Sequence, residues 1–268
     1  MKCDLCPRKC LVDRKKGEKG ICGQTENLKV ARAALHFWEE PCISGDAGSG
    51  AVFFSGCPLH CVFCQNENIA NGTVGKEISL ERLVDIFLEL QEKRANNINL
   101  VTPGHFVPQI VKALDQARKE GLTLPVVYNT SSYETVDTIK MLEGYVDIYL
   151  PDFKYMSPVL SKKYSHAPDY AEVAKAAIAE MVRQTGKAVF VNGDEDNLIL
   201  SGTIVRHLTL PGCMADSMQI LKYLHDTYGD MIYISIMNQF TPLSNLEKYP
   251  ELNRRITDEE YETLVDYA

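Results

Sequence analysis

The sequence predicts an α/β fold built around a parallel sheet. Short apolar runs alternate with amphipathic helical stretches along most of the chain, which is the pattern of such a sheet. A cysteine-rich loop follows the first of these runs, and polar residues end several others. Parallel α/β folds place their chemistry at these carboxyl ends of strands. The 268 residues suffice for one domain with a sizeable core and a small appendage.

Composition is that of an ordinary soluble globular protein, with 45% hydrophobic and 24% charged residues. No apolar run approaches the length of a membrane span, and the start has no apolar signal region, so we expect a cytoplasmic protein. Nine cysteines there indicate metal or redox chemistry rather than disulfides. The net charge of −8 argues against a general nucleic-acid binder.

The chain opens with four cysteines spaced C-x2-C-x3-C-x11-C: Cys3, Cys6, Cys10 and Cys22. This stretch is too short and polar to build its own core, so a metal ion is the natural way to fold it. The spacing does not choose between zinc and a second iron–sulfur cluster, and four unliganded thiols are the alternative. We expect this metal site to be separable from another group of cysteines in the loop from Ser55 to Asn66.

The central motif is the loop from Ser55 to Asn66, where Cys57, Cys61 and Cys64 are spaced C-x3-C-x2-C. Three close thiolates suit an iron–sulfur cluster, and a four-iron cluster would keep one iron free of protein ligands. That iron could bind a substrate or cofactor directly. A structural zinc loop or buried core cysteines are the alternatives, although zinc usually takes four ligands, often from C-x2-C pairs.

The division of the chain follows from these two motifs. We expect residues 1–45 to form a cysteine-rich metal-binding segment with a connector, and residues 46–268 to form the core domain. In the connector, Pro41 ends any helix that includes Glu39 and Glu40. These carboxylates suit metal binding or proton transfer, and a solvated acidic pair is an equally good interpretation.

The elements of the core domain follow in order. Ser79 is the expected N-cap of the first helix, and Gly121 ends the second. A hairpin is expected for residues 187–192 and 197–200, around residues 193–196. The final helix starts after Thr257 and reaches the last residue without a cap, which suggests that the chain ends early. Six strands are expected at residues 51–54, 98–102, 125–130, 145–150, 203–210 and 231–236. Helices are expected at residues 78–94, 107–120, 133–142, 170–184, 214–228 and after 258.

Several stretches together resemble one protein family. They include Cys3 to Cys10, Glu39 to Pro41, Phe53 to Asn66, residues 97–108, 128–133 and 147–155, and Arg206 to Gly212. The sequence resembles the radical S-adenosylmethionine (radical SAM) proteins related to pyruvate formate-lyase activating enzyme that carry an N-terminal cysteine-rich segment. The resemblance implies a partial (β/α)6 TIM-like barrel. It also implies a 4Fe–4S cluster on Cys57, Cys61 and Cys64 whose open iron binds SAM. The reduced cluster would cleave SAM to methionine and a 5′-deoxyadenosyl radical.

The resemblance also implies partners and an activity. We expect an electron donor such as flavodoxin or ferredoxin, and hydrogen abstraction from a substrate. The leading expectation is activation of a glycyl radical enzyme, which makes the substrate a protein. Modification of a peptide, small metabolite or RNA is the first alternative, and an iron–sulfur electron-transfer protein that does not use SAM is the second.

Cofactor-binding residues are carried over from the family position by position, and no catalytic residue is assigned. The turn Thr102-Pro103-Gly104-His105 replaces a glycine-glycine-glutamate turn that meets the SAM amino group. Contacts there would come from backbone carbonyls or from His105, and a core or surface position for His105 is as well supported. The predicted SAM-binding residues are Asn66, Thr102, Gly104, Asn129, Asp152, Lys154, Arg206 and Gln239. Cys42 and Cys213 are expected to be structural.

Overall fold

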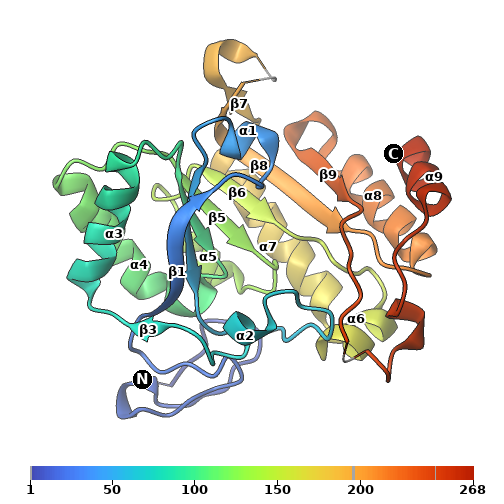
Figure 1. Cartoon of the computed structure of the whole chain (residues 1–268), viewed down its shortest axis with the longest axis horizontal. Coiled ribbons are helices and arrows are strands. Elements are labelled where there is room, and N and C mark those ends of the chain that lie inside the picture. The colour runs from blue at the N-terminus through green and yellow to red at the C-terminus, as the bar shows by residue number, and fades with distance from the viewer. Residues whose placement is uncertain (1, 195–196, 245) are drawn as a thin grey trace.

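The structure is a computed structural model that describes residues 2–194, 197–244 and 246–268. Its strands form one sheet in the order β3-β1-β2-β4-β5-β6-β8-β7, with β9 paired to β8 (Figure 1). The parallel strands are β2 (Ser49–Phe54), β4 (Ile98–Val101), β5 (Val126–Thr130), β6 (Ile148–Pro151), β8 (Ile199–Leu208) and β9 (Tyr233–Met237). The six expected strands and the α/β fold class are therefore confirmed, and the sheet is consistent with a partial TIM-like barrel.

Helices connect these strands and cover the outer face of the sheet (Figure 1). The hydroxyl of Ser79 accepts a hydrogen bond from the Arg82 amide at 3.2 Å, which confirms the predicted N-cap. The last helix begins with a capping box between Thr257 and Glu260. The helices are α1 (Pro41–Ser44), α2 (Glu67–Ala70), α3 (Leu80–Glu92), α4 (Val107–Lys119), α5 (Val136–Lys140), α6 (Pro158–Ser165), α7 (Tyr170–Thr185), α8 (Met214–Tyr228) and α9 (Asp258–Tyr267). Among the described helices, none is long and apolar enough to cross a membrane.

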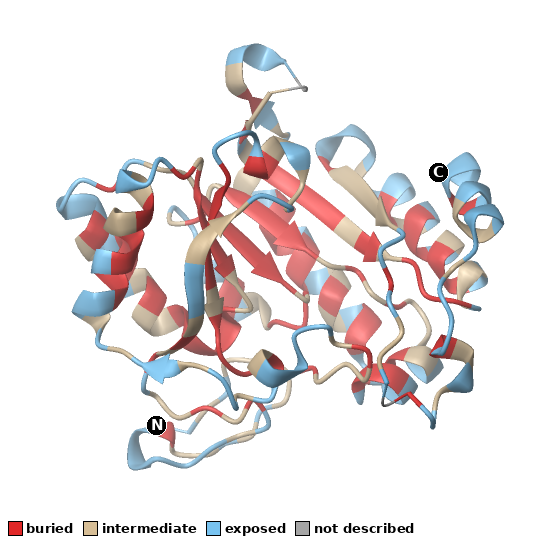
Figure 2. Ribbon diagram, in the orientation of Figure 1, coloured by how far each residue is buried: buried red, intermediate tan, exposed pale blue. Residues whose placement is uncertain are grey.

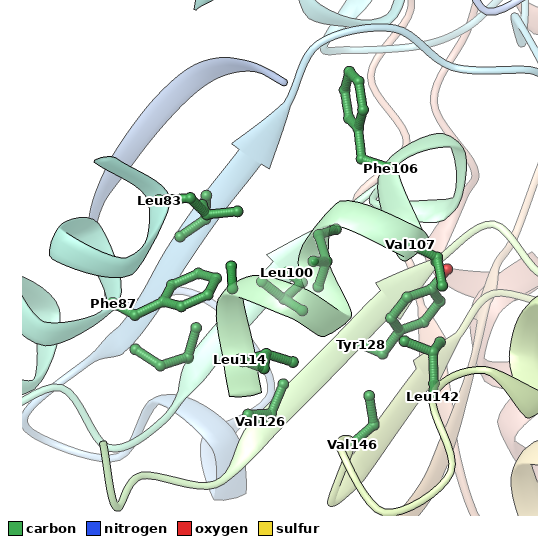
Figure 3. Packing of buried hydrophobic residues seen from close by; sticks show 14 of the residues in the cluster. Leu83, Phe87, Leu100, Phe106, Val107, Leu114, Val126, Tyr128, Leu142 and Val146 are labelled. Atoms are coloured by element: carbon green, nitrogen blue, oxygen red, sulfur yellow. The ribbon is translucent and has the colours of Figure 1, made fainter. Parts of the chain in front are cut away.

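The largest core cluster lies between the sheet and the helices α3 and α4. In Figure 3, Leu83 and Phe87 of α3 and Leu114 of α4 point toward Leu100 and Val126 on neighbouring strands. Each of these five side chains is fully buried. Figure 2 shows that burial is greatest along the central strands of the sheet. This packing holds the carboxyl ends of the parallel strands in fixed positions relative to one another.

The sheet contains two strands that the sequence did not predict. The strand β1 (Lys29–His36) pairs antiparallel with β2, and β3 (Lys76–Glu77) pairs with the start of β1. The β1 sequence is rich in alanine and lacks an alternating apolar pattern, so only its pairing with β2 makes it a strand. Because β1 belongs to residues 1–45, the predicted boundary at residue 45 divides a continuous sheet.

Other boundaries also differ from the prediction. The expected strands at 197–200 and 203–210 are one strand, β8, whose first residues pair with β7 (Val189–Phe190). Two residues of the predicted hairpin turn, Glu195 and Asp196, lie outside the described residues. Helix α5 is shorter than predicted, and α6 was not predicted. Pro41 begins a helix, α1, because proline fits the first helical turn, where no amide partner is needed.

Candidate active site

The loop from Ser55 to Asn66 directly follows β2, at the carboxyl end of the parallel strands. A cavity of about 510 Å³ opens beside it. All three predicted cluster ligands line this cavity, with seven of the eight predicted SAM-binding residues. These ten residues are Cys57, Cys61, Cys64, Asn66, Thr102, Asn129, Asp152, Lys154, Arg206 and Gln239. The fold thus brings together residues that are up to 182 positions apart in the chain (239 minus 57).

The three thiols have surroundings that suit an iron–sulfur cluster. Burial, together with the nearby Cys61, raises the pKa of Cys57 to about 12, so a positive metal centre is needed to hold these thiols as thiolates. Burial also raises the pKa of Cys61, but the Lys154 ammonium and the Ser165 hydroxyl favour its thiolate. The Ser165 hydroxyl donates to Cys61 Sγ at 3.0 Å. The donor set therefore fits a group that supplies positive charge and takes three thiolates.

Among the described side chains, no three or more His, Cys, Asp or Glu residues form a group that could hold a single metal ion. A four-iron cluster does not need such a group, because each thiolate binds a different iron atom. A single zinc ion in the N-terminal segment would need it, because zinc thiolates converge on one centre. The second metal site therefore stays a prediction.

The N-terminal cysteines nevertheless have contacts of the kind found around metal thiolates. The Ile21 amide donates to Cys10 Sγ at 3.3 Å. Cys22 is buried, and the other three are half-buried. Burial raises the pKa of Cys6 to about 12, with a backbone amide of Arg8 acting in the opposite direction. The charges of Cys22 and Cys10 also raise the pKa of Cys6, so these thiols are costly to leave as thiolates without metal.

Replacing Cys3, Cys6, Cys10 and Cys22 by alanine tests this second site. We expect purified variant protein to lose zinc, or the iron that exceeds the first cluster, because the replaced thiolates would be the ligands. Metal analysis of the parent and the variant, both reconstituted anaerobically, measures the difference. An unchanged metal content would mean that the segment is only a cap on the domain.

An ion-pair network forms one wall of the cavity. Asp152, just after β6, pairs with Arg206 on the neighbouring strand β8, where Arg206 Nε lies 2.9 Å from Asp152 Oδ1. The Lys154 ammonium lies 2.5 Å from Asp152 Oδ2. Burial alone would raise the pKa of the Asp152 carboxyl, but the charges of Arg206 and Lys154 outweigh it and lower this pKa. Asp152 is therefore a carboxylate at neutral pH.

Glu39, from the connector, completes the network and was not among the predicted site residues. Its Oε1 accepts from Arg206 at 2.6 Å. Its Oε2 accepts from the side-chain amides of Asn99 at 3.1 Å and Asn129 at 3.0 Å. Its side chain is only 11% exposed and lines the cavity, so a solvated position for Glu39 is excluded. The sequence feature that could have indicated this role is Asn99, because a polar side chain in a buried strand requires a polar partner.

This network limits what Arg206 can do. Its Nε and both terminal nitrogens already donate to Asp152, Glu39 and Asn129. A SAM carboxylate can therefore reach it only beside these partners or in place of one of them. The position of Arg206 in the cavity wall is observed, and its contact with SAM stays a prediction.

One part of the turn after β4 lines the cavity, and the other part is buried in the core. Thr102 lines the cavity with φ of 55°, a conformation that is strained for a β-branched residue. Gly104 is not among the residues that line it, and a Cβ at this position would lie 2.4 Å from the Glu134 carboxylate. His105 is buried, and its Nε2 donates to the Ser55 carbonyl at 2.7 Å. Burial lowers the pKa of His105 to about 4, so the ring is neutral and supports the loop from the core.

Glu134, under this turn, predicts a pH dependence of stability. Burial raises its pKa from 4.5 to about 7, although hydroxyl hydrogen bonds from Thr130 and Tyr128 oppose this shift. The folded state therefore binds this proton more tightly, and stability is fully present below the unfolded pKa and falls as pH rises toward 7. The loss should be about 3 kcal/mol. Denaturant unfolding from pH 4.5 to 8 should show it in the parent and not in Glu134→Gln. The exposed Glu92→Gln is the control, and equal pH profiles for parent and Glu134→Gln would contradict the prediction.

Comparison with known proteins identifies the family. A sequence model described as the radical SAM superfamily matches residues 51–197, which is more than half of the chain. An uncharacterized protein of Methanocaldococcus jannaschii is 27% identical over 275 residues, covering 99% of this chain and 74% of its own.

Solved structures share the fold at low sequence identity. Methylornithine synthase (PylB) has a TM-score of 0.53 at 15% identity, over 78% of this chain and 58% of its own. The protein anSMEcpe, solved with bound AdoMet, has a TM-score of 0.53 at 12% sequence identity, and the match covers 80% of this chain and 57% of anSMEcpe. Streptococcus suis SuiB, solved with its precursor peptide SuiA, has a TM-score of 0.51 at 13% sequence identity, and the match covers 79% of this chain and 43% of SuiB. This chain thus spans about half the length of these proteins. With the family match over most of the barrel, the chain belongs to the radical SAM superfamily.

Proposed function

We propose that this protein cleaves SAM at a 4Fe–4S cluster held by Cys57, Cys61 and Cys64, and uses the resulting radical to abstract hydrogen from a substrate. The observation that carries the proposal is the shared cavity, because three thiols and seven predicted SAM-binding residues line one space. The radical SAM superfamily, to which the chain belongs, uses such a cluster with SAM. When bound, the cluster supplies the electron that breaks the sulfonium bond of SAM.

The residues of the cavity would bind and orient SAM. Its carboxylate and ammonium need charged or amide partners, which Lys154, Asp152 and Asn129 offer from one wall. Apolar side chains of Phe53, Leu208 and others exclude water from the same space. A radical abstracts hydrogen only from a carbon held at near-contact distance, so this fixed wall serves to position the reacting atoms.

The assay for this step uses reduced, anaerobically reconstituted protein mixed with SAM. We expect release of 5′-deoxyadenosine and methionine, measured by chromatography. An iron–sulfur electron-transfer protein that does not use SAM would release neither product, so their absence with a full cluster would overturn the proposal.

For the substrate, we propose a glycyl radical enzyme, which this protein would activate by abstracting hydrogen from a glycine backbone carbon. The support is the resemblance to activating enzymes together with the rim of the cavity. Trp38 lines the cavity and is 89% exposed, which is unusual for a large aromatic residue and typical of contact surfaces. Arg32 and His36 of β1 also line the cavity. A macromolecular segment could contact these side chains while it places one residue in the cavity.

The predicted hairpin does not contribute to the opening beside the cluster loop. Leu198 packs beside Gly45, after α1, at the amino ends of the parallel strands. Figure 1 shows β7 and α1 at the opposite end of the sheet from α2 and the N-terminal segment. Of the described residues, none of the hairpin lines the cavity. The described residues of the hairpin therefore offer no contact surface for a substrate at this opening.

Mixing reduced protein, SAM and candidate glycyl radical enzymes from the same organism tests this substrate. Electron paramagnetic resonance should reveal a glycyl radical on one of them. If none forms, and deoxyadenosine forms instead on adding a peptide, small metabolite or RNA, the activase proposal fails while SAM cleavage stands.

A further inference from the structure

Arg8, in the N-terminal cysteine-rich segment, joins three separate parts of the chain. Its Nε donates to the Pro58 carbonyl at 2.9 Å, and Pro58 directly follows Cys57. Its terminal nitrogens donate to the carbonyls of Ser165 at 3.1 Å and His166 at 2.6 Å. The guanidinium also lies over the Tyr133 ring, 5.1 Å from its centroid. One side chain therefore connects residues 3–22, the cluster loop and the end of α6.

The chemistry of these acceptors requires arginine. Ser165 and His166 end α6, where unpaired carbonyls and the helix dipole attract positive charge. Pro58 presents a third carbonyl from another direction. A planar guanidinium can donate to three such acceptors at once and stack on an aromatic ring, whereas a lysine ammonium is a point charge without this fixed geometry.

The contacts of Arg8 lead directly to a cluster thiol. Ser165 is fully buried, and its hydroxyl donates to Cys61 Sγ at 3.0 Å. Arg8 thus holds the backbone at Pro58, beside Cys57. It also holds the backbone of Ser165, whose hydroxyl donates a hydrogen bond to Cys61. Hydrogen bonds to cluster sulfurs, and the residues that orient them, tune the reduction potential of iron–sulfur clusters.

The same segment contacts the cluster loop at two more points. His60 Nε2 donates to the Ile21 carbonyl at 2.8 Å, and His60 has a left-handed backbone with φ of 50°. Gly56 has φ of 90°, and a Cβ there would lie 2.4 Å from the Cys22 carbonyl oxygen. With Pro58, these contacts surround Cys57 and precede Cys61. None of the described residues before β1 lines the cavity, so the segment acts on the loop rather than on a ligand.

We propose that Arg8 is a positioning residue that fixes the cluster-binding loop, and that it couples the N-terminal cysteine-rich segment to the geometry and potential of the cluster. The proposal rests on the assignment of the cluster to Cys57, Cys61 and Cys64. It differs from the expectation that the two sites are separable, because the contacts on both sides of Cys57 come from the segment.

The test compares Arg8→Ala, Arg8→Lys and Lys15→Ala with the parent, all as full-length protein reconstituted anaerobically. Lys15 lies in the same segment, is exposed, and forms a 3.9 Å ion pair with the Glu26 carboxylate, so its variant controls for the lost charge. Three properties are measured without SAM: the rate of iron loss to a chelator, the midpoint potential, and the electron paramagnetic resonance spectrum of the reduced cluster. Circular dichroism melting establishes that each variant is folded.

In Arg8→Ala we expect iron loss to be faster by roughly tenfold to a hundredfold, the effect of losing charge-assisted hydrogen bonds. We also expect a shifted midpoint potential and an altered spectrum. Arg8→Lys should lie between Arg8→Ala and the parent, and Lys15→Ala should match the parent. Parent-like iron loss, potential and spectrum in folded Arg8→Ala would overturn the proposal, as would equal effects of Arg8→Ala and Lys15→Ala. If the parent itself assembles no cluster, the assignment of the cluster fails instead, which distinguishes the two.

Discussion

Replacing Cys57, Cys61 and Cys64 together by alanine is expected to abolish SAM cleavage and to remove the iron of the cavity cluster. The reason is that alanine supplies no anionic ligand, and iron–sulfur clusters are held by thiolates. Formation of 5′-deoxyadenosine should fall below detection, because the chemistry depends on the missing cluster. Iron analysis, visible absorption and chromatography of the reaction products measure these effects.

The structure supplies matched controls for this variant. Cys42 and Cys213 are also half-buried and free, but neither lines the cavity. Alanine at either position should leave iron content and SAM cleavage near those of the parent. If the triple variant still cleaves SAM at the parent rate, the assignment of the cluster is wrong.

Replacing Arg206 by alanine is expected to destabilise the protein by about 3–5 kcal/mol, which is typical for removing one partner of a buried ion pair. The variant leaves Glu39 without its cation and Asp152 with Lys154 alone, and the Asp152 and Glu39 side chains are only 14% and 11% exposed. Denaturant unfolding of the protein without cluster measures the effect. The midpoint should fall with little change in the slope.

A second arginine provides the control. Arg254 pairs with Glu260 at 2.7 Å, about as short a distance, but the Arg254 side chain is 45% exposed. Arg254→Ala should cost less than about 1 kcal/mol, because water screens exposed pairs. The combined variant Arg206→Met, Glu39→Gln keeps the Asp152–Lys154 pair and should recover much of the loss, because no charge is then left unpaired. Equal effects of Arg206→Ala and Arg254→Ala would contradict the importance of the network.

The same network carries the predicted SAM contacts. Arg206→Ala and Asp152→Ala should weaken SAM binding by roughly tenfold to a hundredfold, the value of one charge-assisted hydrogen bond. Iron content should stay at the parent level, because neither side chain is a thiolate. Calorimetric titration of SAM at a temperature where the variants are folded tests this. Unchanged affinity in both, with iron intact, would remove these residues from the SAM site.

The sequence by itself determined the local features of this protein. The C-x3-C-x2-C spacing, the apolar run before it and the polar strand ends are short-range patterns, so they were readable without a structure. The parallel strands followed from the alternation of apolar runs with amphipathic helices. Because parallel strands end at one edge of the sheet, the polar residues at those ends were expected to meet, and seven predicted SAM-binding residues line one cavity with the three thiols.

Only the tertiary structure decided which partners these residues find. Glu39 and Arg206 are 167 positions apart, and Arg8 and Ser165 are 157 apart. Neither pairing leaves a pattern in the local sequence, because it depends on how β1 and the N-terminal segment pack against the barrel. The strand β1 is itself such a case, since its alanine-rich sequence is extended only by pairing with β2. Local spacing therefore identified the thiols, and long-range packing decided how they are held.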